Sequence, residues 1–287
     1  MKVAYLSDIH AEFLNYPNLH ADKGGDILLL AGDIFTANMV APHRTDADSK
    51  KLKKWLNGPF KEFTSKYDQV LYVFGNHEHY NSIYKNTHLG IMKFLQSNGF
   101  NNVFVMENDY IDIDGVRFIG ATLWTDYNKG NPLTMEIVER GMNDYKMIGL
   151  HDVSDMNYFN RRHNRKINPQ FLLDVHLESV SYIYEKAHDT DLPVVVLTHH
   201  APSFQSVDPD HVSGGPYGYD SLNGAYASDL SSVILDSPNI KFWVHGHTHH
   251  TIDYPIGQCR ILSNQRGYSF EACARHFEGT KSFEIGS

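Results

Sequence analysis

Five short runs of mostly apolar residues recur along the chain, and each has the length of a buried strand. Runs of this length, bounded by polar or turn-forming residues, are typical of strands that are covered on both faces. The predicted strands are Lys2–Leu6, Ile27–Ala31, Val70–Phe74, Pro193–Leu197 and Lys241–Val244.

Segments with apolar residues at helical spacing lie between these strands. The strongest pattern covers Asn168–Lys186, where Asn168 suits the N-cap and Pro169 suits the first helical position. Strands that alternate with helices predict an α/β layer fold. Further helices are predicted over Ser49–Tyr67, with a break or kink at Gly58 and Pro59, over Asn81–Ser97 and over Tyr226–Leu235.

Two segments are typical of hairpins instead. Asp114-Gly115 lies between two alternating runs in Tyr110–Leu123 and favours a type I′ turn, and Gly257 lies in the middle of Tyr254–Leu262. These antiparallel pairs predict a mixed sheet. The polar stretches Thr125–Ile167 and Ala201–Ala225 are longer than ordinary connections, so we expect them to form the rim of a functional site. We expect one domain over residues 1–287.

Composition limits the class of protein. Hydrophobic residues make up 41% of the chain and charged residues 21%, which excludes overall disorder. The apolar runs are far too short to span a membrane. A net charge of 25 − 34 = −9 argues against a broad nucleic-acid-binding surface, although a local basic groove stays possible. Two cysteines are too few for a disulfide framework, so we expect a cytoplasmic protein.

Asp, Asn or His side chains follow each of the five predicted strands. In open α/β sheets, ligands bind outside the carboxyl ends of the strands, so these side chains should converge if the strands are parallel neighbours. The segments that follow the strands are, in order, Ser7-Asp8-Ile9-His10, Gly32-Asp33, Gly75-Asn76-His77-Glu78, Thr198-His199-His200 and His245-Gly246-His247-Thr248-His249.

The converging side chains are typical metal ligands: two carboxylates, one amide and four imidazoles, with no thiolate. They exceed the usual protein share of one catalytic metal, so two metals about 3.5–4 Å apart fit better. Nitrogen and oxygen ligands without sulfur favour Mn, Fe, Zn or Ni. The donors are Asp8, His10, Asp33, Asn76, His199, His247 and His249.

The same blocks, in this order, resemble the five-block signature of the calcineurin-like metallophosphoesterases. Other segments are similar to recurring segments of a bacterial and phage-type subgroup whose members are mostly uncharacterised. Those segments are Ala121–Thr125, Met142–Tyr145, Thr198–Pro202 and Asn264–Tyr268. The resemblance implies a two-sheet αββα sandwich with mixed sheets, and a cytoplasmic enzyme of a bacterium or a phage-infected cell.

The resemblance also implies a role for each residue. Asp8, His10 and His249 would hold the first metal, Asn76, His199 and His247 the second, and Asp33 would bridge the two. The implied reaction is hydrolysis of a phosphate mono- or diester by a hydroxide that bridges the metals, with Mn as the favoured metal. His77 would protonate the leaving oxygen or stabilise the transition state. Glu78 is a departure, because many members of the family have Asp there.

Five further residues are candidates for supporting roles. His200 and His245 adjoin predicted ligands and would orient them. Asn143, Tyr217 and Arg266 would contact the substrate, which we expect to be a small nucleotide-like or other phosphorylated molecule. Two alternatives stay open: a nuclease with the same blocks, and a non-catalytic scaffold with the same fold. The presence of His77 and of all seven donors argues against the scaffold.

Overall fold

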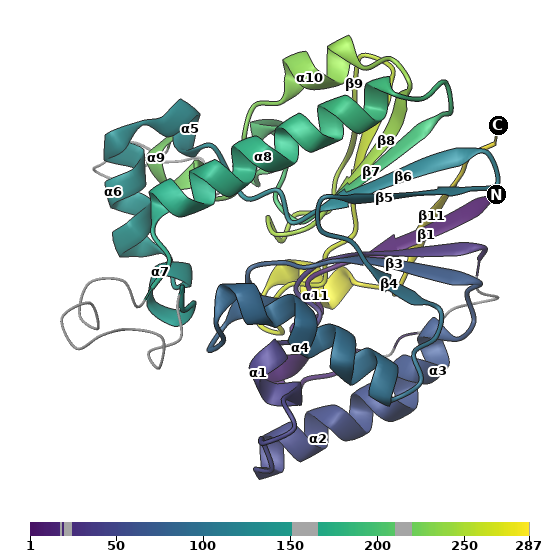
Figure 1. Ribbon diagram of the computed structural model, residues 1–287, viewed down its shortest axis with the longest axis vertical. Coiled ribbons are helices and arrows are strands. Elements are labelled where there is room, and N and C mark those ends of the chain that lie inside the picture. Colours follow the sequence, from purple (N-terminus) through teal and green to yellow (C-terminus); the bar gives the residue numbers. More distant parts are fainter. Residues whose placement is uncertain (18, 20–24, 151–165, 210–219, 287) are drawn as a thin grey trace.

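The computed structural model describes residues 1–17, 19, 25–150, 166–209 and 220–286 (Figure 1). One of its two sheets has the strand order β11-β1-β2-β3-β4. Strands β1 to β4 are parallel neighbours, and β11 is antiparallel to β1. The bounds are β1 Lys2–Leu6, β2 Ile27–Ala31, β3 Gln69–Val73, β4 Val103–Val105 and β11 Lys281–Glu284.

The second sheet has the order β5-β6-β7-β8-β10-β9. Its four inner strands are parallel, and the two predicted hairpins supply its antiparallel edges, β5–β6 and β9–β10. Positive φ at Asp114 (48°) and Gly115 (78°) fits a type I′ turn. The bounds are β5 Asp109–Ile113, β6 Val116–Ala121, β7 Val194–Thr198, β8 Ile240–His245, β9 Asp253–Ile256 and β10 Cys259–Ser263.

The two sheets pack face to face over a shared apolar core. Val3, Leu29 and Leu71 from the first sheet meet Leu197 and Val244 from the second, and all five are almost fully buried. Each of these residues has chain neighbours that point to the opposite face of its sheet, so each sheet is apolar on both faces. Such sheets need a helical layer on the outside as well.

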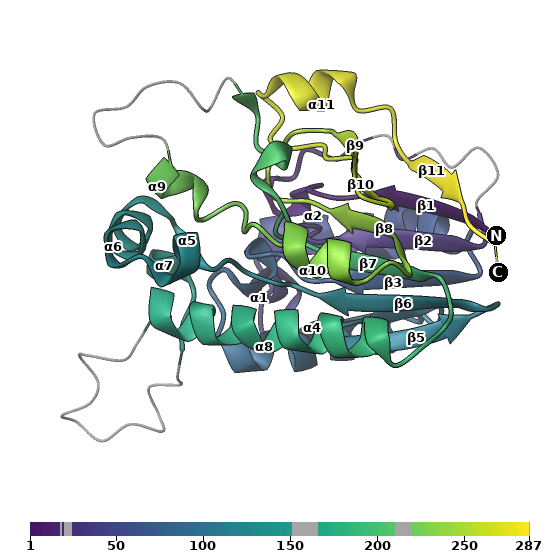
Figure 2. The ribbon, with the colours of Figure 1, turned by 90° about the horizontal axis from the view of Figure 1, so that it is seen from above.

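Helices supply those outer layers, as Figure 1 shows. The first sheet is covered by α1 (Ala37–Val40), α2 (Ala47–Trp55), α3 (Lys61–Thr64) and α4 (Tyr84–Ser97). The second is covered by α8 (Pro169–His188), which runs along the strands in Figure 2, and by α10 (Ser231–Asp236). The predicted two-sheet αββα sandwich with mixed sheets is therefore confirmed.

The two long polar stretches are partly helical. One contains α5 (Tyr127–Gly130), α6 (Pro132–Gly141) and α7 (Asp144–Met147), and the other contains α9 (Asp220–Asn223). These helices gather beyond one end of the sandwich, opposite the end where the two termini lie together (Figure 1). Helix α11 (Ala272–His276) precedes β11. The rim role of both stretches, and the single domain, stay predictions.

Two helix predictions need adjustment. The break expected at Gly58 and Pro59 is a turn of π-helix, Leu56–Phe60, which joins α2 directly to α3. The helix expected from Tyr226 begins five residues later, because Ala227 pairs with Ala201 as an isolated bridge. Asn168 caps α8 as predicted, with its Oδ1 accepting a hydrogen bond from Phe171 N at 2.9 Å. No helix in the described part of the chain is long and apolar enough to cross a membrane.

Candidate metal centre

The predicted donors come from the carboxyl ends of strands in both sheets. Strands β1, β2 and β3 lead into the segments that carry Asp8, His10, Asp33 and Asn76, and β7 and β8 lead into those with the other three donors. The donors converge as expected, but they come from the strand ends of two facing sheets and not from one sheet. Asp8 joins them by accepting a hydrogen bond at Oδ1 from His247 N, at 3.1 Å.

One group of donors consists of Asp8, His10 and His249, whose candidate ligand atoms all lie within 4.8 Å of one another. The Nε2 atoms of His10 and His249 are 3.1 Å apart. His249 Nε2 is also 3.4 Å from Asp8 Oδ1. These three residues are the set predicted for the first metal.

A second group consists of Asp33, His199 and His247. His199 Nε2 lies 3.2 Å from His247 Nδ1 and 3.1 Å from Asn76 Oδ1. The amide oxygen of Asn76 thus faces the same point as the two imidazoles. With Asp33 shared, this is the set predicted for the second metal.

Asp33 lies between the two groups. Its Oδ2 is 3.7 Å from His10 Nε2, and its Oδ1 is 3.5 Å from His199 Nε2. Each carboxylate oxygen therefore faces a different group, which is the arrangement that a bridging carboxylate requires. Burial raises the pKa of Asp33 well above its ordinary value, and the nearby carboxylates of Glu78 and Asp8 raise it further, so positive charge placed here would be stabilising.

Each of the four imidazoles has its other ring nitrogen beside an acceptor. His10 Nδ1 is 3.2 Å from Glu12 Oε1, and His249 Nδ1 is 2.7 Å from Glu271 Oε2. The corresponding acceptors for His199 and His247 are the carbonyl oxygens of Ala31 at 2.8 Å and Ala225 at 3.3 Å. An acceptor on the outer side places the ring proton there, which leaves a lone pair on the inner nitrogen.

The distances between these inner nitrogens show whether the donor set suits a metal. Two lone pairs that face each other at 3.1–3.2 Å repel unless a cation lies between them. Burial lowers the pKa of His10 to about 4 and the pKa values of His199 and His247 well below the ordinary value. His249 differs, because burial is outweighed by its hydrogen bonds with Asp8 and Glu271, which raise its pKa to about 9, so a metal at the first group would replace its Nε2 proton. Neutral imidazole is the form that binds metal, so the donor set fits divalent cations at both groups.

The backbone at the donors is held in an uncommon conformation. Positive φ, between 48° and 71°, occurs at Asp8, His10, Asp33, His247 and His249. Non-glycine residues rarely adopt such angles, and they persist at functional sites because the surrounding structure enforces them. These strained turns carry donors that are two residues apart, such as His247 and His249, to the two different groups.

Gly75 provides space for the centre. A Cβ on this residue would lie 2.6 Å from His199 Cε1 and would collide with Asp33 Oδ1. The buried Glu78 organises the same turns, because its carboxylate accepts hydrogen bonds from the backbone of Asp33, Ile34 and Gly75 at 2.7–3.0 Å. The longer side chain at this position therefore has a structural use here.

Asp144 orients the amide of Asn76. The Nδ2 of Asn76 donates to Asp144 Oδ1 at 2.8 Å, and the Tyr80 hydroxyl donates to the same oxygen at 2.7 Å. This contact assigns the amide nitrogen to the outer side and the oxygen to the metal side. It also joins the stretch Thr125–Ile167 to the centre.

His77 is buried beside the first group. Its ring is stacked on Tyr80, with centroids 4.1 Å apart, and its centroid is 4.4 Å from that of His10. Glu12 Oε1 is 2.7 Å from His77 Nδ1, and the Tyr268 hydroxyl is 3.2 Å from His77 Nε2. His77 Nε2 is therefore on the side of Tyr268.

The five supporting candidates differ in placement. The His200 ring packs 4.2 Å from that of His247, with Nδ1 3.2 Å from the Thr122 carbonyl oxygen, whereas His245 Nε2 is 2.8 Å from Ser206 Oγ. Asn143 is exposed, next to Asp144. The buried Arg266 donates to the Ile9 carbonyl oxygen and to Asn15 Oδ1. Tyr217 lies outside the described residues. The roles of all five stay predictions.

Sequence reasoning missed Glu12, Asp144, Glu271 and Tyr268. Glu12 follows His10 by two residues and could have been considered from its proximity alone. Asp144 directly follows the predicted Asn143 in the sequence, but the sequence pattern does not indicate which of the two faces the centre. Glu271 lies beyond the last block and gives no sequence signal, because its contact with His249 depends on the chain returning past the turn at Gly267.

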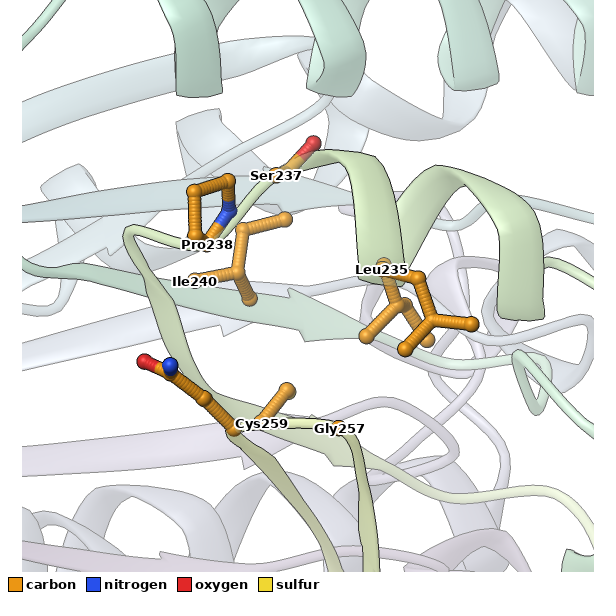
Figure 3. A pocket seen from close by; sticks show the side chains of 8 residues that line it. Leu235, Ser237, Pro238, Ile240, Gly257 and Cys259 are labelled. Atoms are coloured by element: carbon orange, nitrogen blue, oxygen red, sulfur yellow. The ribbon is translucent and has the colours of Figure 1, made fainter.

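A cavity of about 230 Å³ lies at the other end of β8, between α10 and the β9–β10 hairpin (Figure 3). Apolar side chains, including Leu235 and Ile240, form much of its lining. Burial raises the pKa of Cys259, which also lines it, to about 12, so its thiol is neutral. The lining does not offer the carboxylates and imidazoles that the strand ends supply.

A two-sheet sandwich that presents two facing groups of carboxylate and imidazole donors is the architecture of a metal-dependent hydrolase. The chain belongs to the calcineurin-like phosphoesterase family, whose model matches residues 1–251. It is accordingly a metal-dependent phosphoric ester hydrolase. The family in general uses two metals, and this chain has residue groups that can bind them.

Two relatives illustrate the match. The uncharacterized protein L509 of Acanthamoeba polyphaga mimivirus is 29% identical over 273 residues, which is 93% of this chain and 91% of that protein. The crystal structure of a phosphopantetheinyl hydrolase from Mycobacterium tuberculosis is similar with a TM-score of 0.64, covering 98% of this chain and 95% of that chain. At 14% identity this second likeness shows the fold alone.

Proposed function

We propose that the protein is a dinuclear phosphoesterase that hydrolyses a mono- or diester of a small phosphorylated substrate. The observation that carries the proposal is the position of Asp33, with one carboxylate oxygen facing each of two groups of inward imidazole nitrogens. Asp8, His10 and His249 hold the first metal, and Asn76, His199 and His247 hold the second. Mn is the metal that we propose, with Fe, Zn and Ni also compatible with nitrogen and oxygen ligands.

When bound, the two cations supply an activated water nucleophile and neutralise the charge of the phosphoryl oxygens. The protein's own groups fix the geometry of this reaction. Glu12, Glu271 and the carbonyl oxygens of Ala31 and Ala225 hold the four imidazoles in the tautomers that direct a lone pair inward. Because these contacts are already formed, at buried or partly buried positions, the ligands do not have to reorganise when substrate binds.

His77 acts on the leaving group. Glu12 Oε1 lies 2.7 Å from His77 Nδ1 and accepts its proton, which fixes the ring with Nε2 on the opposite side. In the free protein, His77 Nε2 is 3.2 Å from the Tyr268 hydroxyl. When substrate is bound, Nε2–H would instead donate its proton to the leaving oxygen. Departure of the alcohol therefore occurs on the side of the centre where His77 and Tyr268 lie.

A paired assay tests this proposal. Protein loaded with Mn²⁺ is compared on p-nitrophenyl phosphate and bis-p-nitrophenyl phosphate, with Asp33→Asn as the blank. We expect hydrolysis of at least one ester, and a decrease in kcat of about 10²–10⁴-fold in His77→Ala at unchanged metal content. The proposal fails if metal-replete protein hydrolyses neither these esters nor natural phosphate esters, and the His77 variant behaves as wild type.

The setting is part of the same proposal. Cys259 and Cys273 are both free thiols, which supports a reducing, cytoplasmic location. The net charge of −9 supports a small substrate in preference to a nucleic-acid duplex. Measurement of cleavage and of salt-dependent binding with a DNA duplex distinguishes the two.

A further inference from the structure

Three aromatic residues form an exposed cluster that we call the aromatic platform: Phe13, Tyr268 and Phe270. Phe13 is 59% exposed and Phe270 is 75% exposed. The partly buried Tyr268 links them, because its ring packs edge-on against Phe13 with centroids 5.5 Å apart and is stacked on Phe270 at 5.6 Å. Neighbouring large apolar rings that stay in water indicate a surface with a binding partner.

The platform is continuous with the first group of donors. The Tyr268 ring centroid is 4.6 Å from that of His10 and 4.8 Å from that of His249. The Phe13 ring centroid is 6.3 Å from that of His77. A molecule bound at the metal centre on this side must therefore contact the platform.

The direction of the reaction identifies which part of the substrate lies there. In the proposed function, on which this inference rests, the oxygen of the leaving group receives its proton from His77. The atoms attached to that oxygen then extend from His77 toward the platform. They belong to the alcohol that is released and not to the phosphate that stays with the metals.

We propose that the aromatic platform binds the base of a nucleotide, so that the substrate is a phosphate ester of a nucleoside. Exposed aromatic faces stack on planar rings, and base stacking on aromatic side chains tolerates any base, because each base has a π-face. A sugar phosphate or glycerol phosphate presents no such ring. The platform would therefore select the substrate by its leaving group without contacting the phosphate.

A matched pair of substrates tests the platform. Adenosine 5′-monophosphate and glycerol 3-phosphate both release a primary alcohol, so their intrinsic reactivities are similar, and the methyl diesters of the same two compounds serve if diesters are preferred. We expect kcat/KM of the Mn²⁺-loaded wild type to be at least about tenfold higher for the nucleotide. In Phe13→Ala and Phe270→Ala this ratio should fall about five- to tenfold, mainly through KM, and Phe→Tyr at either position should restore it.

Phe104→Ala is the control, because Phe104 is an exposed ring of strand β4 in the other part of the first sheet, 43% exposed. It should leave the ratio unchanged. A second readout does not depend on turnover: saturation transfer from the protein to the base protons of adenosine monophosphate should be strong in wild type and weak in the double variant Phe13→Ala/Phe270→Ala.

The outcomes separate this inference from the proposed function. Hydrolysis of both esters with equal kcat/KM, or a ratio that the platform variants do not change, overturns the nucleotide assignment and leaves the phosphoesterase intact. Absence of hydrolysis of any ester by metal-replete protein overturns the proposed function. Loss of saturation transfer in the Phe104 control would also contradict the platform, because it would place the base elsewhere.

Discussion

Asn76 donates its amide hydrogen to Asp144 Oδ1 across 2.8 Å, while its own Oδ1 lies 3.1 Å from His199 Nε2. This contact, supported by the Tyr80 hydroxyl 3.2 Å from Asn76 Nδ2, decides which end of the amide faces the second metal. Without the acceptor, the side chain could rotate and present its NH₂ group, which cannot bind a cation. Asp144 thus fixes the orientation of a proposed metal ligand without being a ligand itself.

Asp144→Ala should weaken binding of the second metal about 10–100-fold, because the Asn76 amide loses its fixed orientation. Titration with Mn²⁺ under calorimetry measures this, since the two sites should separate into a tight and a weak class. Asp144→Asn is the matched control: it keeps an oxygen that accepts from Asn76, so its loss should be several-fold smaller. Equal losses in both variants, at comparable thermal stability, would argue against the orienting role.

Glu271 should act in the same way on the first metal. Its Oε2 is 2.7 Å from His249 Nδ1 and fixes the tautomer that leaves Nε2 to face Asp8 and His10. We expect Glu271→Ala to reduce affinity for the first metal about tenfold or more, and Glu271→Gln, which keeps an acceptor oxygen, to reduce it less. Calorimetric titration is again the measurement. A loss confined to the second metal would show that the two groups are wrongly assigned.

Glu107 gives a prediction for pH. Burial raises the pKa of this carboxyl to about 7 from an ordinary value of 4.5, although hydrogen bonds from Thr122 oppose the shift. The folded protein therefore binds more protons than the unfolded chain between these two pH values, and the free energy of unfolding falls as pH rises through them. The contribution that is fully present below pH 4.5 is lost by about pH 7, and its size is about 3 kcal/mol.

The side chain of Glu107→Gln cannot ionise. The free energy of unfolding of this variant should therefore increase relative to that of wild type as pH rises from about 4.5 to 7. Urea unfolding at several pH values measures the difference between the two proteins. Glu62→Gln, at an exposed position of α3, is the control and should show little change. A constant difference between wild type and the Glu107 variant across this range would contradict a raised pKa.

Most of the fold follows from local pattern. Each predicted strand forms within one residue of its expected bounds, and both hairpins form where glycine permits the turn. The division of the strands between two sheets does not follow from their sequences, because β3 and β7 carry similar apolar runs. That division depends on which faces pack together. The connection at Gly58 and Pro59 likewise stays helical because Trp55 and Phe60 on either side are held in the core.

The site likewise contains residues that could be predicted from the sequence and residues that could not. Residues directly after strands, such as Asp33 and His199, are placed by the sheet, so their convergence could be inferred from position along the chain. The groups that hold them come from distant segments. Glu271 reaches His249, and Ala225 presents only a backbone oxygen to His247, which no side-chain pattern can indicate. The aromatic platform also combines residues more than 250 positions apart.

Electron paramagnetic resonance of the Mn²⁺-loaded protein is the most direct test of the central claim. Two Mn²⁺ ions bound per chain and bridged by Asp33 should give an exchange-coupled spectrum, because the two groups of donors share a carboxylate and such metals lie about 3.5–4 Å apart. Asp33→Asn should weaken or abolish the coupling. One bound Mn²⁺ per chain, or two ions with the spectra of isolated Mn²⁺, would contradict a dinuclear centre at this site.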